Sequence, residues 1–212
     1  MHTTVLGAAG RTGSLIVAQA ADARHHVTAL VRDISAYDPP RGQVVAQRAD
    51  VLDPASLQGV LDGSDLVINA IGPRNGKKPD RVYSQGMANL TTEMRRADIR
   101  RLVTISAVPA SLPEEKNRFE RYLLHPILWR FFGPSYADLR LMETALHTST
   151  DIDWTIVRPP LLTDDDPTGT YRTAVDSHLK SAKKISRADL ADAMLAAGRD
   201  DSLIGHVLTV SI

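Results

Sequence analysis

Short apolar runs recur along the chain and are separated by longer segments in which apolar residues have helical spacing. Residues 66–71 form an almost continuous apolar run, which is typical of a strand buried on both faces. Similar runs predict further strands at residues 3–6, 27–32, 44–46, 102–105, 154–157 and 207–210.

The segments between these runs predict helices. In residues 14–23, Leu15, Ile16 and Ala18 are distributed as on a helix, and residues 83–97 and 187–197 are further helical segments. Asp53 followed by Pro54 is an N-cap residue followed by proline at the first helical position. Strands that alternate with helices predict an α/β fold, a doubly wound (Rossmann-type) and mostly parallel sheet.

The length of 212 residues fits one domain with one core. Residues 109–140 and 159–185 break the alternation of strands and helices. Both segments follow the carboxyl ends of predicted strands, where open α/β sheets bind their ligands. We therefore expect one domain over residues 1–212, in which these two segments form a small substrate lobe.

Composition narrows the possible functions. Lys plus Arg and Asp plus Glu both number 25, so the formal net charge is zero, which argues against a nucleic-acid partner. The chain has no cysteine, which excludes disulfides, thiolate metal sites and a cysteine nucleophile. Neither a signal peptide nor a membrane span is predicted, so we expect a cytoplasmic protein. The sequence does not indicate an oligomeric state.

The glycine-rich segment at residues 7–13, GAAGRTG, follows a predicted strand and opens a predicted helix. In that context Gly7 permits the tight turn, Gly10 lets the backbone approach a pyrophosphate, and Gly13 allows close packing of helix on strand. The start of the helix offers free N–H groups and a partial positive charge to phosphates. The spacing is G-x-x-G-x-x-G, and it predicts a dinucleotide site.

The end of the second predicted strand, LVRD at residues 30–33, indicates which dinucleotide is bound. An acidic residue there would hold the ribose of NAD, whereas an arginine would accept the 2′-phosphate of NADP. Arg32 ends the strand, and we expect Arg11 to lie on the same side of the adenosine, so the two guanidinium groups could clamp the phosphate. Asp33 can point away or cap the following turn. The pattern therefore favours NADPH over NADH.

These segments together resemble the atypical short-chain dehydrogenase/reductases, in particular the NmrA-like NAD(P)H-binding proteins and those similar to flavin reductase/biliverdin reductase B. The resemblance rests on GAAGRTG, LVRD, ADVLD (49–53), INAIG (68–72), VTISAV (103–108), DWTIVRPP (153–160) and SRADLADAML (186–195). The motifs cover nearly the whole chain in the expected order.

The resemblance implies a set of cofactor-binding residues. Residues 9–13 would cradle the pyrophosphate, Asp50 would bind the adenine amino group unless it only caps a turn, and Ser106 would lie near the nicotinamide. Related reductases carry a histidine where this chain has Leu161, which implies a more apolar nicotinamide pocket. The full implied set is Gly7, Ala9, Gly10, Arg11, Thr12, Gly13, Arg32, Asp50, Val51, Ala70, Ile71, Gly72, Ser106, Pro159, Pro160 and Leu161.

The Tyr-x-x-x-Lys pair of typical short-chain dehydrogenases is missing, because none of the five tyrosines is followed by lysine four residues later. Tyr136 with Arg140 is the nearest approximation, and arginine is a different electrostatic group from lysine. Tyr136 and Ser106 are therefore the candidate catalytic residues. Tyr136 could instead pack beside the lobe, and Ser106 could simply be satisfied at the strand end.

Three other segments have simpler interpretations. Residues 122–132 are rich in aromatic side chains, and we favour a lid over the nicotinamide, with core packing, an oligomer contact or a membrane patch as alternatives. The adjacent His25 and His26 point different ways, and residues 164–166, three aspartates, suggest a solvated turn. No metal site is predicted.

The leading functional hypothesis is an NADPH-dependent oxidoreductase that transfers hydride to a flat conjugated acceptor of the flavin or quinone type. Such an acceptor can take its proton from solvent, so the protein needs to supply orientation and exclusion of water. The alternative is a non-catalytic NAD(P) sensor of the NmrA type. An epimerase is disfavoured, because an epimerase would also use the Tyr-x-x-x-Lys pair, which this chain lacks.

Overall fold

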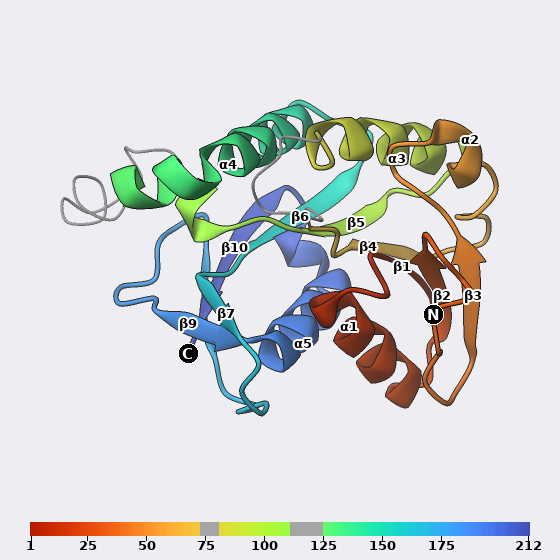
Figure 1. Ribbon diagram of the computed structural model, residues 1–212, viewed down its shortest axis with the longest axis horizontal. Coiled ribbons are helices and arrows are strands. Elements are labelled where there is room, and N and C mark those ends of the chain that lie inside the picture. The colour runs from red at the N-terminus through yellow and green to blue at the C-terminus, as the bar shows by residue number, and fades with distance from the viewer. Residues whose placement is uncertain (73–80, 111–124) are drawn as a thin grey trace.

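The computed structural model describes residues 1–72, 81–110 and 125–212, with the backbone alone for residues 125–131. An eight-stranded sheet forms its centre, and every neighbouring pair of strands is parallel except β8 with β10 (Figure 1). In spatial order the strands are β3 (Val44–Arg48), β2 (His26–Val31), β1 (His2–Leu6), β4 (Leu66–Asn69), β5 (Arg101–Ile105), β6 (Asp153–Arg158), β10 (His206–Ser211) and β8 (Arg172–Val175). The predicted Rossmann-type fold is confirmed.

Helices cover both faces of this sheet (Figure 1). Helices α1 (Arg11–Asp22) and α5 (Arg187–Gly198) pack on one face, and α3 (Ser84–Arg96) and α4 (His125–His147) cover the other. The short helix α2 (Pro54–Leu57) adjoins α3, and 3₁₀ turns lie at Val108–Ala110 and Asp201–Leu203. Among the described residues, no helix is long and apolar enough to cross a membrane.

The inner strands of the central sheet are buried on both faces, as their apolar runs predict, whereas the edge strands β3 and β8 are largely exposed. On β1, Val5 belongs to the core cluster beneath α1 and α5, while its neighbour Leu6 belongs to the cluster beneath α3. Both side chains are at most 1% exposed. Because successive side chains of a strand point to opposite faces, an unbroken apolar run fills both cores.

Side-chain hydrogen bonds cap the starts of two helices, one from the adjoining residue and one from a distant part of the chain. Asp53 accepts a hydrogen bond from the Ala55 N–H at 3.1 Å, which confirms the predicted cap of α2. Helix α3 is capped from a distant part of the chain, because the buried Asp138 on α4 accepts from the Tyr83 N–H at 2.9 Å and from Ser84. This contact joins α3 to α4 beside the cleft described below.

Strands β7 (Leu161–Thr163) and β9 (Lys184–Ser186) form a separate two-stranded sheet within the predicted lobe segment 159–185. Asp189, at the start of α5, accepts hydrogen bonds from Thr168 and Gly169 and so ties the intervening turn to the main domain. Strand β8 lies in the same segment but joins the main sheet through β10. The grouping of both segments into one lobe stays an interpretation.

Candidate cofactor cleft

The turn between β1 and α1 has no room for a side chain at Gly7 or Gly13. Gly7 has φ +75°, and a Cβ added there would lie 2.9 Å from the Ala70 carbonyl oxygen. A Cβ on Gly13 would lie 2.1 Å from the Gly7 oxygen, so helix and turn are in backbone contact. Among the described residues no side chain caps α1, whose N-cap is Gly10. The first N–H groups of α1 therefore face a cleft, and the arrangement suits a bound phosphate.

Two cavities adjoin this turn and share Gly10, Ala70, Ile71 and Gly72, so they form one continuous cleft. The shared segment begins where β4 ends, at the point where strand order reverses between β1 and β4. The apolar run over residues 66–71 predicts a strand to residue 71, but the strand ends at Asn69. The Asn69 side chain accepts a hydrogen bond from the Ile71 N–H at 3.3 Å. Ligands of open α/β sheets bind at such a switch point.

One half of the cleft has a volume of about 420 Å³ and brings together the residues predicted to bind adenosine. The exposed Arg32 and the half-buried Asp50 both line it. Asp50 also accepts from the Leu52 N–H at 3.0 Å, so the predicted capping contact is present as well. Its other lining residues are Gly7, Ala9, Leu30, Val31, Ala49, Val51, Leu52 and Val82.

Asp33 caps the turn after β2 and does not line the cleft half described above. Its Oδ1 accepts from the backbone N–H of Ser35 at 3.0 Å and from the Ser35 hydroxyl at 2.6 Å. These hydrogen bonds lower the pKa of the Asp33 carboxyl. Arg32 is therefore left as the charged side chain at the end of β2 that reaches the cleft.

The other half of the cleft, about 490 Å³ in volume, holds both candidate catalytic residues. The Ser106 side chain lies just beyond the end of β5 and is 6% exposed, and its hydroxyl has no hydrogen-bond partner among the described residues. An unsatisfied buried hydroxyl costs about 1–3 kcal/mol, which a ligand that bonds to it would recover. The remaining lining is mostly apolar or aromatic, with Thr12, Tyr83, Ile105, Ala107, Phe132, Ser135, Leu139 and Leu162.

Tyr136 lines the same half of the cleft, and no lysine is among the described residues that line it. Burial raises the pKa of its phenol, whereas a neighbouring lysine would lower it. Arg140 donates through Nε to the Ala110 carbonyl at 2.7 Å and is not among the described lining residues. At neutral pH Tyr136 is therefore a neutral hydrogen-bonding phenol.

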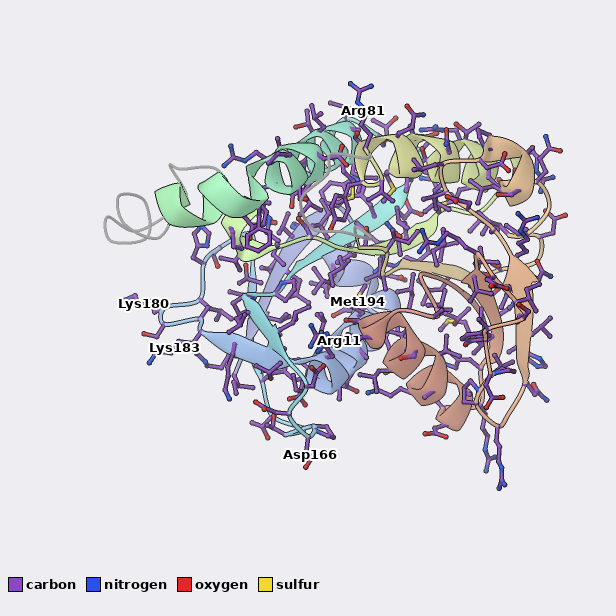
Figure 2. All side chains as sticks on the ribbon, viewed as in Figure 1. Arg11, Arg81, Asp166, Lys180, Lys183 and Met194 are labelled. Carbon is purple, nitrogen blue, oxygen red and sulfur yellow. The ribbon has the colours of Figure 1, made fainter. Side chains whose placement is uncertain are left out.

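Two predicted site residues lie elsewhere than expected. Arg11, labelled in Figure 2, does not join Arg32 at the adenosine end. It lines the other half of the cleft and pairs with Asp164. Leu161 is 68% exposed, and its neighbour Leu162 faces the cleft instead, because successive residues of β7 point to opposite sides. Pro159 and Pro160 are likewise not among the described lining residues.

The sequence reasoning also missed Arg187, which lies in the motif SRADLADAML and lines the cleft beside Arg11. Asp164 was expected to be part of a solvated turn, yet it binds both arginines. The predicted aromatic lid falls largely outside the described side chains. Of that segment, Phe132 lines the cleft with its ring centroid 6.1 Å from that of Tyr136.

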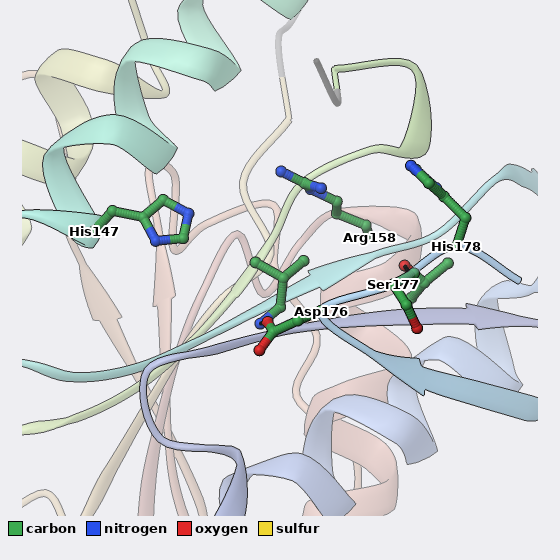
Figure 3. A pocket seen from close by; sticks show the side chains of 7 residues that line it. His147, Arg158, Asp176, Ser177 and His178 are labelled. Atoms are coloured by element: carbon green, nitrogen blue, oxygen red, sulfur yellow. Dashed lines mark hydrogen bonds between the residues drawn. The ribbon is translucent and has the colours of Figure 1, made fainter. Parts of the chain in front are cut away.

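Another cavity lies apart from the cleft and its glycine turn, between the end of α4 and strands β6 and β10 (Figure 3). Arg158 in its wall forms a buried two-bond ion pair with Glu143, at 2.7 and 3.0 Å. Asp176 pairs with His206 and accepts from the Val207 N–H. These charges are matched within the protein, and neither a glycine turn nor a helix start is among the described residues that line this cavity, so the cleft is the better candidate for a cofactor site.

Comparisons with known proteins show the family of this chain. The NAD(P)H-binding family model matches residues 7–201. An uncharacterized chloroplastic protein of Arabidopsis thaliana is 33% identical over 177 residues, which are 78% of this chain but 60% of that protein, so this chain spans about three-fifths of that relative.

Two solved structures show the same fold. A short-chain dehydrogenase/reductase from Veillonella parvula in complex with NADP has a TM-score of 0.83 at 18% identity, covering 100% of this chain and 94% of that one. A candidate NADH-flavin reductase from Streptococcus pneumoniae has a TM-score of 0.80 at 21% identity, covering 100% and 99%.

Proposed function

The chain belongs to the NAD(P)H-binding family, and on that premise we propose that it is an oxidoreductase that passes hydride from NADPH to a flat conjugated acceptor of the flavin or quinone type. The observation that carries this proposal is the cleft itself. The glycine turn lies at its middle, Arg32 at one end, and the unpartnered Ser106 hydroxyl within the mostly apolar other end.

The residues of the cleft fit a nicotinamide dinucleotide. The uncapped start of α1 would bind the diphosphate, and Asp50 with Val51 would bind the adenine. Arg32 would pair with a 2′-phosphate, which favours NADPH over NADH. The fold neighbour from Veillonella parvula was solved with NADP. When bound, the cofactor supplies the hydride.

The protein's own residues would orient the acceptor and keep water out. Ile71, Ile105, Leu139 and Leu162 form apolar walls, against which a flat ring system can stack. Ser106 would donate to or accept from the nicotinamide amide or the acceptor. Tyr136, held neutral, could donate a hydrogen bond to an acceptor oxygen or nitrogen.

The nature of the acceptor follows from the missing acid–base pair. Reduction of an isolated carbonyl needs a positioned proton donor of tuned pKa, and the described cleft does not provide one. A flavin or quinone delocalises the electrons and can take its proton from solvent. The fold neighbour with a flavin reductase name is in keeping with this acceptor class. The cytoplasmic location stays a prediction.

The test is NADPH oxidation by the purified protein, followed by the absorbance of NADPH, against a panel of flavins and quinones. Calorimetry measures NADPH binding separately. Turnover with any of these acceptors would support the proposal, provided that the Ser106→Ala substitution lowers the turnover rate. Tight NADPH binding without turnover across the panel would refute it and favour a sensor.

A further inference from the structure

Three side chains from distant parts of the chain meet beside the acceptor half of the cleft. Arg11 is the first residue of α1, Arg187 is the first residue of α5, and Asp164 follows β7. One oxygen of the Asp164 carboxylate pairs with Arg11, and the other accepts from Arg187 Nη1 at 2.6 Å. A single carboxylate thus bridges two guanidinium groups.

The charges at this point do not balance. Arg11 and Arg187 are the charged residues in the described lining of this half of the cleft, and Asp164 supplies one negative charge against their two. Both arginines also lie at helix starts, where the backbone adds partial positive charge. The start of α1 would use part of this charge for the cofactor diphosphate, and Arg187, on a separate helix, remains a cation that can bind a further anion.

Arg187 is better placed than Arg11 to bind an anion inside the cleft. Its side chain is 14% exposed, whereas those of Arg11 and Asp164 are 65% and 60% exposed. Burial lowers the pKa of Arg187, because the charged form loses hydration, and a second anion would compensate for that loss. The unpartnered hydroxyl of Ser106, 6% exposed, lines the same space and points independently to a polar ligand there.

The loop that carries Asp164 is held by other contacts. Asp165 pairs with Lys184 on β9 at 2.8 Å, and Asp189 binds Thr168 at 2.9–3.1 Å. Release of Asp164 from the arginines would therefore leave the loop in place. The exposed carboxylate could rotate into water while another anion takes its position.

This inference rests on the proposed function. We propose that the hydride acceptor carries an anionic group, a phosphate or a carboxylate, which binds Arg187 together with Arg11, and that Asp164 is the internal counter-ion that this group displaces. The acceptor ring then lies against the apolar wall that includes Leu162, two residues before Asp164. The arginines at the two helix starts would recognise the charge, and strand β7 would contribute to recognition of the ring.

FMN and riboflavin test the proposal, because they share one ring system and differ in a phosphate. Their affinities are measured by quenching of flavin fluorescence, with saturating NADP⁺ occupying the diphosphate site. We expect FMN to bind about tenfold more tightly than riboflavin, since a charge-assisted pair partly offset by the loss of Asp164 remains favourable. The preference should fall as salt is added.

Variants assign the preference to these residues. Arg187→Gln should bring the FMN to riboflavin affinity ratio close to one, and Arg187→Lys should keep part of it. Asp164→Asn should raise the ratio several-fold, because the competing carboxylate is gone. The matched control is Arg41→Gln, an exposed arginine before β3 at the far edge of the sheet, which should leave the ratio unchanged.

The outcomes separate this inference from the proposed function. A ratio near one in the unaltered protein, or one that Arg187→Gln leaves intact, overturns the anion site even if both flavins are reduced by NADPH. A ratio that follows the variants as expected, without NADPH oxidation by any flavin or quinone, supports the anion site and refutes the reductase. Failure of both flavins to bind overturns the anion site, whereas the reductase is refuted only if the quinones are not reduced either.

Discussion

Replacing Arg32 with glutamine should change cofactor choice more than cofactor binding as a whole. Arg32 is the charged side chain at the end of β2 that lines the adenosine half of the cleft, since Asp33 is turned to Ser35 and Arg11 to Asp164. NADPH and NADH differ only in the 2′-phosphate, so the variant isolates one contact.

The structure sets the expected size of this effect. A hydrogen bond to a charged group contributes about 1.5–3 kcal/mol, and the exposure of Arg32 to solvent favours the lower end of that range. NADPH affinity should therefore fall about tenfold, and NADH affinity should change less than about threefold. The NADPH affinity of the Arg32→Lys variant should lie between those of the unaltered protein and of Arg32→Gln, because lysine keeps the charge but loses the two-pronged geometry.

Calorimetric titration of both cofactors at two salt concentrations is the assay. The matched control is again Arg41→Gln, which removes the same charge far from the cleft. Equal losses for NADPH and NADH on mutating Arg32 would refute the assignment of this residue to the 2′-phosphate. A salt-independent loss would count against a charge-based contact.

Three further outcomes are expected. Ser106→Ala should raise the free energy of unfolding in urea by about 1–3 kcal/mol, because its buried hydroxyl has no partner among the described residues, while NADPH-dependent turnover falls; a loss of stability would contradict this. Gly13→Ala should abolish NADPH binding and lower stability by about 2 kcal/mol or more in thermal unfolding, since its Cβ would meet the Gly7 oxygen; wild-type binding would contradict the observed packing. Burial acts to raise the pKa of Asp189, but hydrogen bonds such as that from Thr168 outweigh it and lower the pKa. Its contribution to stability is therefore present above about pH 4 and is lost as the pH falls through the lowered value, so Asp189→Asn should flatten the acid limb of a stability profile; an unchanged limb would contradict this.

Much of the fold could be predicted because its signals are local. The apolar run before residue 70 and the Asp53–Pro54 helix start were correctly interpreted, since strand burial and capping depend on neighbours in sequence. The extent of α4 was not predicted, because Pro134 lies inside it and proline usually ends a helix. The short strands β7, β8 and β9 are three or four residues long, too short for a clear periodicity.

The glycine turn could be recognised from its residues alone, because the contacts that require Gly10 and Gly13 arise within that short segment and Gly7 has a φ of +75°. The close approach of Gly7 to Ala70 depends on the fold. The direction of the Arg11 side chain could not be predicted from the sequence. A long side chain at a helix start can reach either half of the cleft, and its partner Asp164 comes near only through the β7 lobe and the packing of α5 on α1. Backbone geometry is set by neighbours along the chain, whereas the pairing of flexible charged side chains depends on which distant segments the fold brings together.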